Sequence, residues 1–179
     1  HQGGRSLLRL INQILDLTKL SAGRYKLERI AVDANTMLWS MRSVFESRAV
    51  EKGVTLECDA PPDLVLEADE NALSMMLSQL LENAISFTPC GGTVRLIGTR
   101  GDGVVRLEVS DNGPGVAADD IARILRPFEQ GGRGTSDHTA GAGLGLTLVK
   151  AMAELHGGAL DIESAPGKGL TARVILPAV

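Results

Sequence analysis

Apolar side chains recur at helical spacing over the first twenty residues of the chain. Within residues 6–20 they fall at Leu7, Leu10, Ile11, Ile14 and Leu17, with Leu8 and Leu15 on the flank. This pattern predicts a helix with a broad apolar face, which Ala22-Gly23 ends. The face needs a covering partner, and a second copy of the helix in a bundle would supply one.

Two further helices carry clear start and stop signals. Asp33 is placed to cap a helix that runs to Lys52 and stops at Gly53. Asp69 is placed to cap another helix, which ends before Pro89. The residues of this helix that we expect to face inward are Leu73, Met76, Leu77, Leu80, Leu81, Ala84 and Ile85. Shorter helices are predicted over residues 119–125 and 145–156.

Strand patterns lie between these helices. Strands are predicted over residues 54–58, 65–68, 94–98, 104–109, 159–164 and 170–176. Residues 101–103 are predicted to form a tight connection between two strands. Residues 129–143 are rich in Gly, Ser and Thr and are predicted to form a mobile loop. Helices mixed with mostly antiparallel strands predict an α+β fold, a two-layer sandwich of helices on a mixed, mostly antiparallel sheet, preceded by one long helix.

Composition narrows the class of protein. The 179 residues are 44% hydrophobic and carry a net charge of −4 without a basic cluster, which argues against a nucleic-acid partner. Cys58 and Cys90 match no metal spacing, so we expect free thiols in a reducing compartment. No apolar run approaches the ~20 residues of a membrane helix. The chain opens at His1 in mid-pattern, so we expect a fragment whose membrane segment, if any, lies upstream.

Two polar segments could carry chemistry. Gln79 and Asn83 are four residues apart and share one helix face. They are either amides whose hydrogen bonds are satisfied within the protein, or a site in which the Asn83 carbonyl oxygen binds a Mg²⁺ ion that also holds phosphates. Residues 111–115 (DNGPG) follow a strand. They form either a simple turn or a binding site, in which the Asp111 carboxylate is fixed beside two glycines that let a flat base approach the backbone. The Asp111 carboxylate would then accept from an exocyclic amine.

Two later segments are weaker when taken alone. Phe128, in residues 125–130 (LRPFEQ), is either a core aromatic or part of a site. Residues 141–146 (GAGLGL) lead into a helix, either as a flexible surface loop or as a source of backbone N–H groups for phosphate oxygens. No Gly-Lys-Ser/Thr follows, so this is not a P-loop, and no βαβ context supports a dinucleotide fold.

In this order, the segments resemble the ATP-binding domain of sensor histidine kinases, in the superfamily shared with DNA gyrase, mismatch-repair and heat-shock chaperone ATPases. Residues 79–89 (QLLENAISFTP) resemble the N box and residues 111–115 the first glycine box. The F box, second glycine box and a weaker closing motif are matched by residues 127–130 (PFEQ), 141–146 and 167–169 (GKG). Residues 9–23 (RLINQILDLTKLSAG) resemble the second helix of the dimerisation and phosphoacceptor hairpin, which favours the kinase branch.

The resemblance implies a site for ATP and Mg²⁺ between the N-box helix and the loop. It implies Asp111 as the acceptor from the adenine amino group and Asn83 as the Mg²⁺ ligand, with Gln79 as a second candidate. The other residues that it implies at the nucleotide are Gly113, Gly115, Phe128, Gly141, Gly143, Leu144, Gly145 and Leu146. It divides the chain into residues 1–23, the end of the hairpin, and 24–179, the catalytic domain.

The sequence departs from the family pattern at several positions. Gln79 stands where Asn is usual, Ala142 where Thr is frequent, and Ser86 where a basic residue is usual. The loss of that cation removes charge stabilisation near the phosphates, for which Arg133, Lys150 or His138 are candidate substitutes. None of the three histidines, His1, His138 and His156, sits in an acceptor motif, so we expect the phosphoacceptor upstream of this chain.

Three functions follow from these observations. The first is a protein-histidine kinase core that transfers the γ-phosphoryl of ATP to a hairpin histidine, for relay to an Asp of a response-regulator receiver domain. The second is a degenerate kinase domain that acts as a nucleotide- or partner-binding scaffold, which Ser86 motivates. The third is another ATPase of the superfamily, against which the first helix argues. For the kinase we expect a homodimer through the hairpin, a cytoplasmic location, and a parent protein that is either free or anchored in the inner membrane.

Overall fold

The computed structural model of the protein describes residues 2–127 and 143–178. The helices in these residues are α1 (Gln2–Ser21), α2 (Ala34–Lys52), α3 (Glu70–Phe87), α4 (Ala118–Ile124) and α5 (Gly145–Leu155). The strands are β1 (Arg29–Asp33), β2 (Thr55–Asp59), β3 (Val65–Asp69), β4 (Thr93–Gly101), β5 (Val104–Asp111), β6 (Ala159–Ser164) and β7 (Leu170–Pro177).

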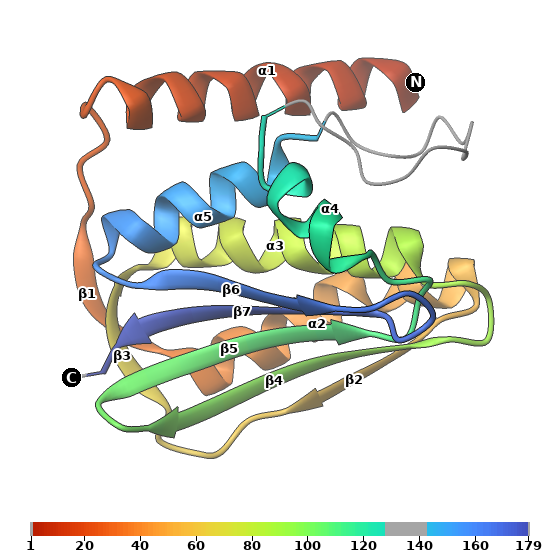
Figure 1. The fold of residues 1–179 in the computed structure, drawn as a ribbon. Helices are drawn as coiled ribbons and strands as arrows, with labels where there is room; N and C mark the ends of the chain where they lie inside the picture. Colours follow the sequence, from red (N-terminus) through yellow and green to blue (C-terminus); the bar gives the residue numbers. More distant parts are fainter. Residues whose placement is uncertain (1, 128–142, 179) are drawn as a thin grey trace.

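A five-stranded sheet with one helical face forms the body of the molecule. Its strand order is β2-β4-β5-β7-β6; β2 runs parallel to β4, and every other neighbouring pair is antiparallel. Helices α2, α3 and α5 lie on one side of this sheet, and α1 lies along the outer side of α5 (Figure 1). The predicted two-layer α+β fold with one preceding helix is therefore confirmed.

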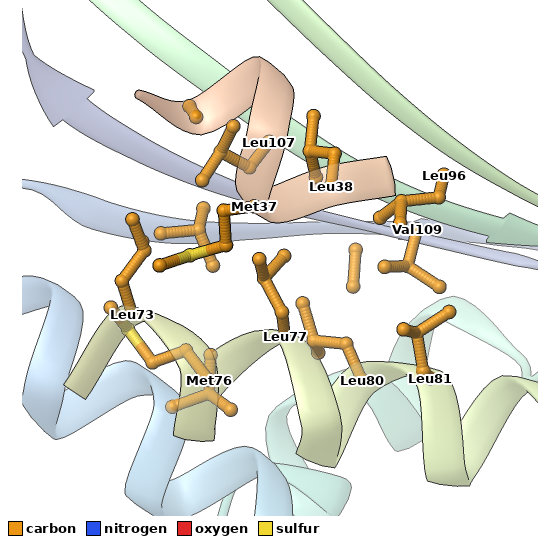
Figure 2. Close-up of a cluster of buried hydrophobic side chains, with 14 of the residues drawn as sticks. Met37, Leu38, Leu73, Met76, Leu77, Leu80, Leu81, Leu96, Leu107 and Val109 are labelled. Carbon is orange, nitrogen blue, oxygen red and sulfur yellow. The ribbon is translucent and has the colours of Figure 1, made fainter. Parts of the chain in front are cut away.

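The core lies between α3 and the sheet. All seven residues of α3 that were expected to face inward are buried, at no more than 5% exposure. They meet α2 and the inner face of the sheet in one apolar layer, in which Figure 2 labels Met37, Leu38, Leu96, Leu107 and Val109. Because full burial of such a side chain contributes about 1.5–3 kcal/mol, this layer fixes α3 firmly on the sheet.

The predicted helix boundaries rest on the expected caps. The Asp33 carboxylate accepts from the backbone N–H of Thr36 (3.2 Å), and the Asp69 carboxylate accepts from that of Ala72 (3.0 Å). Gly53 ends α2 at a φ of 70°, and its N–H donates to the carbonyls of Ala49 and Val50. These contacts span only a few residues, which is why the sequence pattern could predict them.

Strand β1 was missed by the sequence analysis. Residues 29–33 pair antiparallel with β3 in a separate two-stranded sheet, and Val32 is their only buried residue. With one buried side chain there is no apolar alternation to read. The hairpin strand β4 also runs beyond the predicted 94–98, because backbone pairing with β5 continues to Gly101. The predicted mobile loop lies outside the described residues, except for Gly143.

Candidate functional site

The amides of Gln79 and Asn83 lie at the start of α5. Both side chains are half-buried on α3. A Cβ placed on Gly145 would lie 2.8 Å from Oε1 of Gln79 and 3.7 Å from Nδ2 of Asn83. Residues that are far apart in the chain therefore meet where a helix begins, and a side chain at position 145 would have to displace the Gln79 amide.

In the described part of the second glycine box, residues 143–146, Gly145 faces these amides, whereas the two leucines pack into the core. Leu144 is 1% exposed, and Leu146 packs against the core cluster. Gly143 adopts a φ of +72°, which turns the chain into α5. No side chain caps the first turn of α5 in the described part of the chain. The N–H groups of this turn, which have no partner within the helix, are the atoms that could reach a phosphate.

Asp111 ends strand β5 with a partly buried carboxylate. Its Oδ1 accepts from the backbone N–H of Gly113 (2.8 Å) and from that of Leu170 (3.3 Å). Burial raises the pKa of Asp111, and the two hydrogen bonds oppose that rise. The described residues offer Oδ2 no hydrogen bond, so this oxygen is available to an outside donor.

Close backbone packing explains the glycines that follow Asp111. A Cβ on Gly115, at a φ of +65°, would overlap the carbonyl oxygen of Ala165, and a Cβ on Gly169 would overlap that of Asp111. The first glycine box is thus interlocked with residues 167–169, the weaker closing motif. This contact places the turn after β5 before any ligand arrives.

Phe87 is a site candidate that the sequence analysis did not single out. It is the last residue of α3, its side chain is 51% exposed, and its carbonyl oxygen lies 3.1 Å from a Cβ placed on Gly113. An exposed aromatic is notable in a chain with 3% aromatic residues. The signal available in the sequence was its position at the end of the motif at 79–89.

The end of α3 also receives a cation from another helix. The ammonium group of Lys52, at the end of α2, donates to the carbonyl oxygen of Ser86. The sequence analysis had named Lys150 as a substitute cation, but Lys150 lies on the outside of α5 and pairs with Glu154 (3.9 Å). A positive charge is therefore present beside Ser86, supplied from the neighbouring helix.

His156 has a structural place away from this site. It is 2% exposed; its Nδ1 contacts the carbonyl of Met152 (2.7 Å), and its Nε2 accepts from the backbone N–H of Asp69 (3.2 Å). With Nδ1 as the donor, the imidazole joins the end of α5 to the start of α3. This role fits the expectation that His156 is not a phosphoacceptor.

Other predicted positions lie outside the described residues. These are Phe128, Gly141, His1, Arg133 and His138. Among the described residues no cluster of three His, Cys, Asp or Glu side chains could hold a metal ion. A cleft of about 490 Å³ at the opposite end of α3, lined in part by Ile30, Met37 and Asn71, shares no residue with the site.

Residues 68–179 match the family described as histidine kinase-, DNA gyrase B-, and HSP90-like ATPase. The histidine protein kinase DivJ of Caulobacter vibrioides is 40% identical over 178 residues, which cover 99% of this chain and 30% of DivJ. The chain thus spans under a third of that relative.

Solved structures share the whole fold. The crystal structure of full-length ShkA in complex with AMPPNP has a TM-score of 0.86 and 33% identity, covering 99% of this chain and 37% of ShkA. The Acinetobacter baumannii histidine kinase AdeS has a TM-score of 0.79 at 20% identity, covering 96% of this chain and 78% of that chain, which shows the shared fold alone. No helix in the described residues is long and apolar enough to cross a membrane.

Proposed function

Because this chain belongs to the histidine kinase-, DNA gyrase B- and HSP90-like ATPase family, we propose that it binds Mg·ATP as the catalytic core of a sensor histidine kinase. The observation that carries the proposal is the meeting of Gln79 and Asn83 of α3 with the glycine start of α5. Asp111 lies near the C-terminal end of α3, beside Phe87. At about 1.5 Å of rise per residue, α3 advances roughly 6 Å from Asn83 to Phe87, which suits a nucleotide lying along it.

In this proposal the adenine lies at Asp111. Oδ2 of Asp111 accepts from the exocyclic amine, and the base lies beside Gly113. Phe87 offers an exposed aromatic face at the same end of α3. The triphosphate then extends toward the uncapped N–H groups of α5, where Gly143 and Gly145 permit close approach. Phe128 and Gly141 are proposed to belong to the loop that covers the phosphates.

The metal site is proposed to form only with the nucleotide. Mg²⁺ keeps several waters and needs few protein oxygens when phosphates also bind it. Asn83, with Gln79 as the second amide, supplies neutral oxygens suited to that arrangement, and no carboxylate cluster in the described residues would hold the ion alone.

The proposed reaction transfers the γ-phosphoryl group to a histidine outside this chain. The bond from the γ-phosphorus to the bridging oxygen of ADP breaks, and a bond to an imidazole nitrogen forms. The residues of this chain bind and orient the nucleotide, and a receiver-domain Asp then accepts the group. We assign residues 1–23 to the dimerisation hairpin, 24–179 to the catalytic domain, and the working location to the cytoplasm.

The exposed stripe of α1 supports the dimer. Four apolar side chains of this stripe are between 45% and 61% exposed: Leu7, Leu8, Ile11 and Leu15. Such a contiguous exposed apolar patch is typical of a protein–protein contact surface. A second copy of the hairpin would cover them. Any membrane anchor of the parent protein would lie outside this chain.

A scaffold function is the second candidate, and Ser86 favours it. In this candidate the Lys52 ammonium group stays bound to the Ser86 carbonyl and does not reach the phosphates, so the site would hold a nucleotide but transfer its phosphoryl group slowly. A longer protein with an upstream histidine that labels with [γ-³²P]ATP would contradict the scaffold.

Calorimetry of ATP binding with and without Mg²⁺ tests the proposed site. We expect binding that strengthens with Mg²⁺ and is weakened by Asn83→Ala, whereas Mg²⁺ alone should give no signal. The matched control is Asn12→Ala, an exposed amide on α1. Absence of binding at millimolar ATP, roughly −4 kcal/mol, would contradict the nucleotide site.

A further inference from the structure

Gln13 of α1 reaches the amide pair on α3. Its Nε2 donates a hydrogen bond of 2.8 Å to Oε1 of Gln79, which lies 66 positions away in the chain. The same Oε1 would lie 2.8 Å from a Cβ on Gly145. One carbonyl oxygen therefore faces both the N-terminal helix and the start of α5.

This hydrogen bond lies at the border between two halves of α1. Toward its C-terminus, Leu17 and Leu20 pack against the core cluster. On the N-terminal side, Leu8 and Ile11 are 61% and 45% exposed. Figure 1 shows α1 lying along α5 without insertion into the body of the fold. Since Leu8 and Ile11 remain exposed, the hydrogen bond from Gln13 adds to the attachment that Leu17 and Leu20 provide.

We propose that Gln13 is a positioning residue that withholds the Gln79 carbonyl oxygen from the nucleotide site while α1 is docked. The inference rests on the proposed function, in which Gln79 and Asn83 share the Mg²⁺ of Mg·ATP. A Mg²⁺ ligand must approach to about 2.1 Å in a strict octahedral direction. An oxygen that accepts from Gln13 has one of its two lone pairs occupied and its orientation fixed by α1, so it is not free to turn to the direction that the ion requires.

Docking of α1 and binding of Mg·ATP therefore oppose each other. The opposition is reciprocal, because a coupling between two binding events acts equally in both directions. Mg·ATP loosens α1 by the same factor by which docked α1 weakens Mg·ATP. Release of α1 leaves α2, α3 and the sheet intact, because the buried side chains of the core come from Val32 and later residues.

Calorimetry of Mg·ATP with Gln13→Ala measures the effect on affinity. We expect about 2- to 12-fold tighter binding, the range that corresponds to the net worth of a neutral hydrogen bond. Asn12→Ala is the control, because Asn12 is the exposed neighbour on the same helix. ATP in EDTA should show no gain, and Gln13→Ala should add nothing in a Gln79→Ala background.

Hydrogen exchange of the α1 amides measures the opposite direction. Mg·ATP should increase exchange in α1 of the wild type by a similar factor, and Gln13→Ala should show the raised exchange without nucleotide. An unchanged or weaker Mg·ATP affinity of Gln13→Ala, or an equal gain without Mg²⁺, would overturn the proposal while leaving wild-type ATP binding in place. If the wild type and every variant fail to bind ATP, the proposed function fails, and this inference fails with it.

Discussion

Replacing Asp111 by Asn tests the adenine assignment without breaking the turn. Oδ1 of Asp111 holds the N–H groups of Gly113 and Leu170, and the amide oxygen of an asparagine can hold the same two groups. The substitution then puts an NH₂ donor where Oδ2 was. Adenine presents an amine donor at its exocyclic position, whereas guanine presents an oxygen acceptor.

The expected loss of ATP affinity follows from the bond that is removed. A hydrogen bond to a charged group is worth about 1.5–3 kcal/mol, so Asp111→Asn should weaken ATP binding by roughly 13- to 160-fold. GTP should lose less or gain, because its oxygen can accept from the new NH₂ group. Asp111→Ala should lose ATP binding and also destabilise the domain by about 1–3 kcal/mol, since two backbone donors lose their acceptor.

The assay is calorimetry with ATP and GTP at constant Mg²⁺, with thermal unfolding as the check on folding. An Asp111→Asn variant that binds ATP as tightly as the wild type would refute the assignment. Equal losses for ATP and GTP would also refute it, because they would show damage to the site as a whole.

The raised pKa of Asp111 adds a pH dependence. Burial disfavours the ionised carboxylate, so in the free domain this group contributes stability at low pH that is lost as pH rises through the folded pKa. The pH dependence of ATP affinity has the opposite sign to that of stability, because the exocyclic amine donates to the ionised carboxylate. ATP affinity should fall as pH drops through that raised pKa, and the Asp111→Asn profile should show only the titration of the nucleotide.

Three other predictions concern packing and assembly. Gly115→Ala should lower the free energy of unfolding more than Gly103→Ala does, and of these two variants only Gly115→Ala should abolish ATP binding. Both glycines have a positive φ, which costs an alanine about 1–2 kcal/mol, but of the two only Gly115 faces a carbonyl oxygen. Equal losses of stability in chemical unfolding would contradict the interlocked turns. His156→Phe should destabilise the domain by about 1–3 kcal/mol, because the buried N–H of Asp69 loses its acceptor, and His156→Gln should recover part of the loss; no change in unfolding would disprove the contact. Ile11→Glu should halve the mass in light scattering where Asn12→Glu does not, and a monomeric wild type would rule out the dimer.

Local features of this protein were readable from its sequence. The caps at Asp33, Asp69 and Gly53 involve neighbours within four residues, and the apolar face of α3 is a matter of helical spacing. Ordered polar and glycine motifs predicted the family, which the match over residues 68–179 confirms. The assignment of individual residues to ATP or Mg²⁺ stays a prediction.

Contacts between distant segments were decided only by the tertiary structure. Strand β1 has one buried residue and exists because β3 lies beside it. Gly169 is tight against Asp111, and Gln13 holds Gln79, because the sheet order and the path of α1 bring these residues together. A periodic pattern predicts which side of a helix or strand is buried, but it does not predict which backbone group or side-chain amide from a distant segment will lie opposite. That information arises when the layers pack.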